Sequence, residues 1–150
     1  IIYLDAIVPR SGERIGSLMG YVPEDQLAAL DAMLEAGEGP VGSGVHEMQR
    51  AAAKEHPHLM DPAREKWLLD NLSDQPMKAT ACVIPVGAEA IDRPVDYIAA
   101  AVTVMTAMHD RARELGWTIH DHPGDHALLV GDPEGTTDLI LKISGAGAPA

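Results

Sequence analysis

The sequence predicts an α/β fold in which parallel strands are interrupted by a long helical insertion. Short apolar runs of strand length alternate with longer segments of helical periodicity, and this alternation is typical of a parallel sheet covered by helices. Between residues 15 and 75 the pattern is helical, broken by Gly and Pro, with no convincing strand. A chain of 150 residues is long enough to bury one sizeable core.

The first half of the chain is expected to hold one strand and three helices. The strand is expected at residues 1–5, a short apolar run followed by a loop rich in turn residues. Pro23 and the acidic residues after it open the first helix. A second helix is expected at residues 45–55. Asp61, followed by proline, caps a third helix that runs to Leu72.

The second half of the chain returns to alternating strands and helices. We expect a strand at 79–86, a long helix at 94–115, a strand at 117–121, a loop at 122–131 and a last helix at 132–143, opened by Asp132 and Pro133. The predicted organisation is a core at residues 1–14 and 76–144, a helical insertion at 15–75 and a flexible tail at 145–150.

Composition excludes several classes of partner. The formal net charge is −12, and the 11 Lys and Arg residues are scattered, so the chain is expected to repel a nucleic-acid backbone. No apolar run reaches the length of a membrane span. The lone Cys82 excludes a disulfide framework and a zinc site built from cysteines. We therefore expect no nucleic-acid or membrane partner and a reducing, cytoplasmic location.

Asp5 and His126 are the residues most suited to acid–base chemistry. Asp5 stands at the carboxyl end of the first predicted strand, and His126 lies in the loop after the last one. In a parallel sheet both positions fall at the same end of the strands, where ligands bind. A carboxylate that accepts the imidazole N–H fixes its tautomer and stabilises the imidazolium formed when a nucleophile loses its proton. The sequence therefore predicts a carboxylate–histidine pair.

Short motifs spread along the chain resemble a known family. They are residues 2–9 (Ile-Tyr-Leu-Asp-Ala-Ile-Val-Pro), Asp61-Pro62 with Trp67, Gln75-Pro76, Gly116-Trp117, Gly124-Asp125-His126 and Asp132-Pro133. Together they resemble the second half of α/β-hydrolases of the esterase and hydroxynitrile-lyase type, over nearly the whole chain. The resemblance implies that the chain is the C-terminal part of a three-layer α/β-hydrolase fold, with residues 15–75 as a helical cap.

The resemblance also implies a mechanism. His126 is the expected catalytic base and Asp5 the expected acid, serving a serine that attacks a small ester, amide or similar carbonyl and forms an acyl intermediate; hydroxynitrile cleavage is the nearest variant. A cap rich in Leu and Met, with Trp67 and Met19 as expected pocket residues, favours a small hydrophobic substrate. No cofactor and no metal are implied.

The nucleophile is the main departure from the family pattern. The family places a Gly-x-Ser-x-Gly elbow and an oxyanion loop before the strand that opens this chain, and neither motif is present in these residues. The chain also opens on an apolar run without an initiator Met. We therefore expect the nucleophile on an N-terminal half, missing or supplied as a separate chain. The alternative is a non-catalytic structural or regulatory half whose exposed first strand packs against another chain.

Other residues offer alternatives for each role. Some relatives take the acid from the loop after the next strand, which here offers Glu89 and Asp92. His120, His122 and His126 superficially resemble the zinc motif of metallo-β-lactamase-like hydrolases, but two residues rather than one separate the second histidine from the following Asp. The remaining candidate nucleophiles do not sit at a strand-to-helix elbow: Ser11, Ser17, Ser43 and Ser73.

Overall fold

The computed structural model describes residues 1–20, 23–38, 42, 47, 60–73 and 75–146. These residues form two compact units. The first contains residues 1–7, 60–71 and 92–146, and the second contains the other described residues between 8 and 91. Residues 60–71 thus group with the sheet and 76–91 with the second unit; the division into a hydrolase core and a helical cap stays a prediction. The helix expected at 45–55 and the candidate Ser43 lie outside the described residues.

The first unit is built on a sheet of three parallel strands in the order β1-β2-β3. The strands are β1 (Ile2–Leu4), β2 (Asp96–Val102) and β3 (Thr118–Asp125). The register aligns Leu4 with Ile98 and His120 with Ile98 on the other side, so the carboxyl ends of all three strands lie together. The predicted strand at the N-terminus and the predicted parallel sheet are confirmed.

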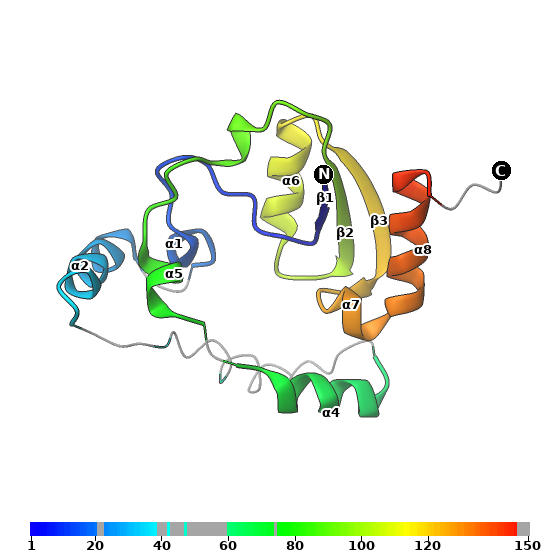
Figure 1. The fold of residues 1–150 in the computed structure, drawn as a ribbon, viewed down its shortest axis with the longest axis horizontal. Helices are drawn as coiled ribbons and strands as arrows, with labels where there is room; N and C mark the ends of the chain where they lie inside the picture. The colour runs from blue at the N-terminus through cyan, green and yellow to red at the C-terminus, as the bar shows by residue number, and fades with distance from the viewer. Residues whose placement is uncertain (21–22, 39–41, 43–46, 48–59, 74, 147–150) are drawn as a thin grey trace. The chain divides into compact units, whose positions relative to one another are not determined.

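Helices cover both faces of this sheet, as Figure 1 shows for α6 and α8. The helices of this unit are α4 (Pro62–Asn71), α6 (Thr106–Glu114), α7 (Leu128–Gly131) and α8 (Pro133–Ser144). On the α8 side, Ile98, Ala100 and Leu128 form a buried cluster against Leu139 and Ile143. Full burial of one such aliphatic side chain contributes about 1.5–3 kcal/mol. The result is a helix–sheet–helix sandwich.

Two helix caps that the sequence predicts are present in the structure. The Asp132 carboxylate accepts the N–H of Gly135 at 3.0 Å at the start of α8. The Asp61 carboxylate accepts the N–H groups of Ala63 and Arg64 at 2.9 and 3.1 Å at the start of α4. Each cap satisfies backbone donors that a helix leaves unpaired at its N-terminus.

The second unit is mainly helical, with α1 (Ile15–Leu18), α2 (Glu24–Glu35), α5 (Met77–Ala81) and the short 3-10 helix η1 (Ala88–Ala90). Its centre is the Arg14 guanidinium, which donates to Glu24 at 2.9 Å, to Asp31 at 2.8 Å and to the carbonyl of Ala81 at 2.6 Å. These charged and backbone partners compensate the desolvation of a largely buried cation. Arg14 therefore ties α2 and α5 together.

The predicted strand at 79–86 is wrong. The segment begins inside α5, and Val83 makes only an isolated antiparallel bridge to Arg14. Pro76, with a ψ of 129°, stands at the N-cap of this helix. Ala and Lys, which favour helices, occupy its positions. A short apolar run does not by itself distinguish a buried helix from a strand.

The predicted helix at 94–115 is wrong in its first half. Residues 96–102 form the central strand β2, and only residues 106–114 are helical. The run from Tyr97 to Val102 is rich in alanine, which favours helices in isolation. A central strand of a parallel sheet is buried on both faces, so it carries a continuous apolar run instead of alternation. Tertiary burial here overrides local propensity.

The last predicted strand is longer than expected, because β3 continues to Asp125 through part of the predicted loop. It contains Pro123, which the strand tolerates because β3 lies at an edge of the described sheet. Its pairing with β2 shifts register between Ala100 and Val102. This irregularity lies beside Asp5 and His126, which hydrogen-bond to the backbone of Ala100 and Val102.

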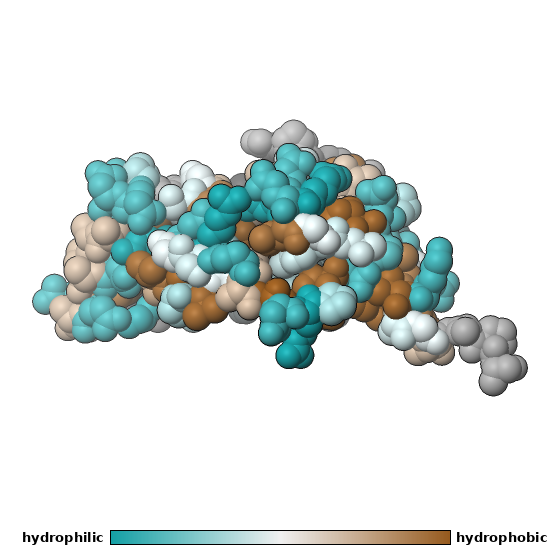
Figure 2. All heavy atoms as spheres, turned by 90° about the horizontal axis from the view of Figure 1, so that it is seen from above, coloured by the Kyte–Doolittle hydropathy of each residue, from teal (hydrophilic) through white to brown (hydrophobic). Residues whose placement is uncertain are grey.

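The surface combines polar and apolar residues, and Figure 2 shows hydrophobic side chains emerging between hydrophilic ones on the face in view. The large exposed hydrophobic residues of the first unit are Ile1, Trp67, Val102, Val104, Leu129 and Leu141. None of the helices in the described ranges has the length and apolar character needed to cross a membrane.

Candidate active site

Asp5 stands directly after β1 and is fully buried. Its backbone has a φ of +40°, the one positive value among the non-glycine residues that the structure describes. Asp tolerates this left-handed region better than most residues, although some strain remains. Its N–H donates to the carbonyl of Ile98 at 2.7 Å, which continues the β1–β2 pairing by one residue. The turn therefore fixes the direction of the Asp5 side chain.

Four donors surround the Asp5 carboxylate. Oδ1 accepts the N–H of Ala100 at 3.1 Å and a hydrogen bond from Nε2 of His109 at 2.6 Å. Oδ2 accepts the hydroxyl of Thr103 at 2.6 Å and a hydrogen bond from Nδ1 of His126 at 2.8 Å. An ionised carboxylate offers about four lone-pair positions. The donor set therefore saturates this one.

The pKa of Asp5 is lowered by this donor set. Burial by itself raises the pKa of the carboxyl group, but the hydrogen bonds from His126, Thr103, His109 and Ala100 outweigh it, and the pKa falls from 3.8 to about 2. Hydrogen bonds to the charged form of an acid stabilise that form. Asp5 is therefore ionised at neutral pH in spite of its burial.

His126 follows β3 and links the buried carboxylate to the surface. Its N–H donates to the carbonyl of Val102 at 3.0 Å, and its side chain is 46% exposed. Because ionised Asp5 can only accept, Nδ1 of His126 carries the proton in this hydrogen bond. In the neutral ring, Nε2 then keeps its lone pair, which is the state that a general base requires.

Further hydrogen bonds link the segments around Asp5. The Tyr97 hydroxyl donates to the carbonyl of Ala6 at 2.7 Å, and burial together with the charge of Asp5 raises the pKa of the Tyr97 phenol. The Thr103 hydroxyl, besides donating to Asp5, accepts the N–H of Met105 at 2.9 Å. The Tyr97 bond attaches the loop after β1 to β2, and the Thr103 bonds attach the start of α6 to the Asp5 carboxylate.

The alternative acids Glu89 and Asp92 lie elsewhere. Glu89 is in η1 of the second unit, where its carboxylate accepts the N–H of Ser11 at 2.8 Å. Hydrogen bonds from Ser11 lower the pKa of Glu89. The Asp92 side chain is 94% exposed. The structure therefore brings His126 together with Asp5 and gives these two carboxylates other surroundings.

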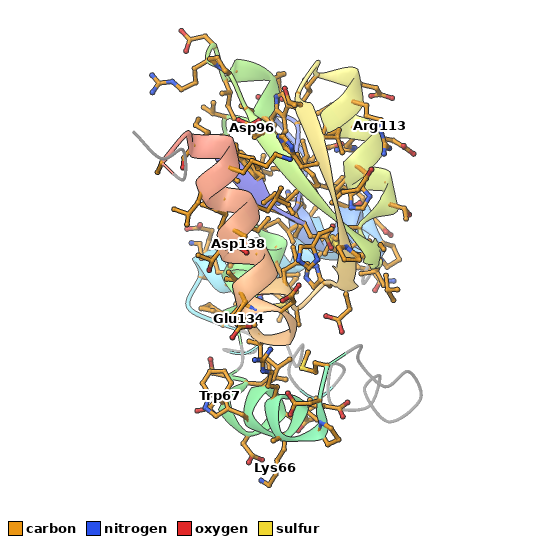
Figure 3. All side chains as sticks on the ribbon, turned by 90° about the vertical axis from the view of Figure 1, so that its right-hand side faces the viewer. Lys66, Trp67, Asp96, Arg113, Glu134 and Asp138 are labelled. Carbon is orange, nitrogen blue, oxygen red and sulfur yellow. The ribbon has the colours of Figure 1, made fainter. Side chains whose placement is uncertain are left out.

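The three histidines of the zinc-like motif have separate partners. His120 hydrogen-bonds to Asp96 at 2.8 Å. Figure 3 shows Asp96 at the end of the unit opposite Glu134, which lies in the first turn of α8. His122 is buried, and its Nδ1 accepts the N–H of Gly124 at 3.0 Å. Within the described ranges, no three His, Cys, Asp or Glu side chains are arranged to hold a metal ion.

The predicted pocket residues belong to different units. Trp67 lies on α4, where Figure 3 labels it, and its exposed fraction is 58%. Met19, in the second unit, directly follows α1 and is half-buried. The serine candidates Ser11 and Ser17 are also in the second unit, where the Ser11 hydroxyl accepts the N–H of Gly87 at 2.9 Å. The pocket roles of Trp67 and Met19 stay predictions.

Thr103 and His109 were missed in the sequence. Both fall inside the segment predicted as one long helix, which hid the fact that Thr103 follows a strand. A usable signal existed, because an apolar run followed by a polar residue occurs at Leu4-Asp5 and again at Val102-Thr103. Nothing in the local pattern around His109 indicates that its ring reaches a carboxylate 104 residues away.

The low pKa of Asp5 predicts acid sensitivity. Asp5 has a folded-state pKa of about 2 and an unfolded value near 3.8. The difference contributes about 2 kcal/mol to the free energy of unfolding. This contribution is complete above about pH 5 and is lost as the pH falls toward 2. Urea denaturation of wild type and Asp5→Asn between pH 2 and pH 7 measures this. The stability difference between the two proteins should shrink by about 2 kcal/mol on acidification; a constant difference would contradict the assignment.

Comparison with known proteins shows the fold. No protein-family model matches the chain, and no curated protein matches its sequence. Among solved structures, it is similar to an extracellular α/β-hydrolase from a Paenibacillus species, described as sharing structural and functional homology with tobacco salicylic acid binding protein 2. The TM-score is 0.58 at 14% identity, covering 95% of this chain and 60% of that one.

Two further solved structures overlap less well. E-2-(acetamidomethylene)succinate hydrolase gives a TM-score of 0.45 at 16% identity, covering 83% of this chain and 54% of that one. A hypothetical protein from Pseudomonas aeruginosa gives 0.49 at 17% identity, covering 99% and 58%.

The chain therefore has an α/β fold with parallel strands that is similar to part of an α/β-hydrolase. It spans 60% of the length of the Paenibacillus hydrolase. At 14% identity this likeness shows the fold alone, and folds of this kind carry many chemistries. A function has to be argued from Asp5, His126 and the residues around them.

Proposed function

We propose that this chain supplies the base and the acid of a serine hydrolase of the α/β-hydrolase type. The observation that carries the proposal is the 2.8 Å hydrogen bond between buried Asp5 and half-exposed His126 at the carboxyl end of a parallel sheet. The acid is ionised and inaccessible, whereas the base reaches the surface. This division suits a pair in which only the histidine meets the reacting groups.

In the proposed reaction, Nε2 of His126 takes the proton of a serine hydroxyl as its oxygen attacks the carbonyl carbon of the substrate. The positive charge that forms on the ring is stabilised by Asp5, which stays ionised. His126 then gives its proton to the leaving oxygen, and an acyl-enzyme remains. Water, activated in the same way, attacks the acyl group and returns the serine to its hydroxyl form.

The nucleophile and the oxyanion donors are proposed to lie on polypeptide outside residues 1–150, in an N-terminal half of the same gene product or in a separate chain. Two observations support this. Within the described sheet, β1 pairs only with β2, and Ile1 beside it is 54% exposed. An unpaired parallel strand edge of this kind accepts a further strand. The Paenibacillus hydrolase is also longer than this chain.

A small, mainly apolar ester or related carbonyl compound is the proposed substrate. Val102, whose carbonyl binds the N–H of His126, is 54% exposed, and Leu129, three residues after His126, is 62% exposed. Apolar side chains around a few polar groups are typical of small-molecule sites. A charged substrate would gain little there, because the Asp5 charge is already compensated by four donors.

Fluorophosphonate labelling tests the proposal directly. The protein is purified from its native source with whatever polypeptide accompanies residues 1–150, treated with the reagent, and analysed by denaturing intact-mass and peptide mass spectrometry. We expect one adduct on a serine outside residues 1–150. We also expect the His126→Gln variant to lose labelling, because the serine is activated through His126.

The His120→Gln variant is the matched control, since its ring pairs with Asp96 away from Asp5. It should label as fast as wild type. An unlabelled protein, or labelling that His126→Gln leaves unchanged, would overturn the proposal and favour a structural or regulatory half. An adduct on any serine of residues 1–150 would place the nucleophile inside the chain and overturn the proposed division of the active site.

A further inference from the structure

The Asp5 carboxylate binds two imidazoles, and the proposed mechanism uses only one of them. His109, on α6, directs Nε2 at Oδ1 of Asp5 at 2.6 Å, opposite the oxygen that binds His126. Its side chain is 9% exposed, so it cannot serve as a second surface base. A buried histidine bound to this carboxylate needs a different explanation.

We propose that His109 is a positioning residue that holds the Asp5 carboxylate in the orientation that presents Oδ2 to His126. The torsion that turns a carboxylate about its Cβ–Cγ bond has a broad minimum, so a single anchored oxygen fixes the group poorly. On Oδ1, the contact with His109 at 2.6 Å is shorter than the contact with the Ala100 N–H at 3.1 Å. His109 therefore provides the stronger of the two anchors.

His109 is itself firmly placed, as a positioning residue has to be. Its N–H donates to the carbonyl of Met105 in α6, and its ring meets the ring of Tyr97 edge-on, at 5.5 Å between centroids and an angle of 68°. The Tyr97 hydroxyl is fixed on the carbonyl of Ala6, beside Asp5. Tyr97 on β2 thus supports the ring of His109, and His109 in turn hydrogen-bonds to the Asp5 carboxylate.

Proton placement follows from the same contacts. Ionised Asp5 accepts only, so Nε2 of His109 and Nδ1 of His126 both carry protons in these hydrogen bonds. If the carboxylate turns, the hydrogen bond that holds His126 as the Nδ1–H tautomer weakens. The proton can then move to Nε2, which loses the lone pair that a base requires. His109 acts on the base through this step, and its importance for hydrolysis rests on the proposed function.

The test is ring NMR of the protein together with whatever polypeptide accompanies residues 1–150, and it requires no substrate. Long-range proton–nitrogen spectra of the nitrogen-15-labelled protein near pH 8 report the tautomer of each histidine. Two variants separate hydrogen bonding from packing: His109→Gln keeps an N–H donor at similar reach, and His109→Leu keeps the bulk without a donor. His120→Leu, which breaks the pair with Asp96, is the control.

We expect wild type, His109→Gln and the control to hold His126 as the Nδ1–H tautomer. In His109→Leu the ratio of that tautomer to the other should fall about ten-fold, the effect of losing one hydrogen bond to a charged group. An unchanged ratio in His109→Leu, or an equal fall in His109→Gln, would overturn the proposal and leave His109 as a packing residue. If His109→Leu does not fold, His109→Asn, whose amide is too short to reach Oδ1, replaces it with the same two outcomes.

This result is independent of the serine-hydrolase proposal. Failed fluorophosphonate labelling with the expected histidine spectra would overturn the proposed function and leave His109 as the residue that positions Asp5. Successful labelling with an unaffected His126 tautomer in His109→Leu would support the proposed function and overturn the positioning role of His109.

Discussion

Replacing Asp5 with alanine is expected to lower the free energy of unfolding by about 3–5 kcal/mol, the cost of removing one partner from a buried charged network. The substitution leaves the N–H of Ala100, the hydroxyl of Thr103 and the ring of His109 without their acceptor. It also places alanine at a φ of +40°, a conformation that aspartate tolerates better. Urea denaturation followed by circular dichroism at pH 7 measures the change.

Asp92→Ala is the control for this experiment. Its side chain is 94% exposed, so the expected change is within about 0.5 kcal/mol. The destabilisation of Asp5→Asn should fall between the two. Its amide keeps one acceptor oxygen, but its NH2 group faces donors that the second carboxylate oxygen had accepted. An Asp5→Ala variant as stable as Asp92→Ala would show that the four hydrogen bonds do not hold the carboxyl end of the sheet together.

His126→Gln is expected to lower kcat/KM for a small chromogenic ester such as p-nitrophenyl acetate by about four to six orders of magnitude. The assay uses the protein together with the polypeptide proposed to carry the serine. Without Nε2 of His126 there is no group to take the serine proton, and only binding and oxyanion stabilisation remain. Because His126 is 46% exposed, the free energy of unfolding should change by only about 1 kcal/mol.

The contrast between these two variants distinguishes a base from a structural histidine. His120→Gln should keep kcat/KM close to wild type, because its ring binds Asp96 at the start of β2. Hydrolysis that survives in His126→Gln would remove His126 from the proposed mechanism. A loss of activity in both histidine variants, accompanied by unfolding, would point to a common structural defect instead.

Features governed by neighbouring residues could be predicted from the sequence. The strand before Asp5 and the helices opened by Asp61 and Asp132 were predicted correctly, because apolar periodicity, proline and side-chain caps act within a few residues. The same local rules failed at β2. Its alanine-rich run takes its structure from burial between α6 and α8, which no short window of sequence contains.

The sequence by itself determined that Asp5 directly follows an apolar strand and that His126 comes after the last strand. Only the tertiary structure decided that His109 and Thr103 join His126 on the Asp5 carboxylate, across separations of 104 and 98 residues. The physical reason is that parallel pairing through β2 brings distant strand ends together at one end of the sheet. The ionisation of buried Asp5 depends on that convergence, since its donors come from two segments far from it in the sequence, residues 100–109 and residue 126.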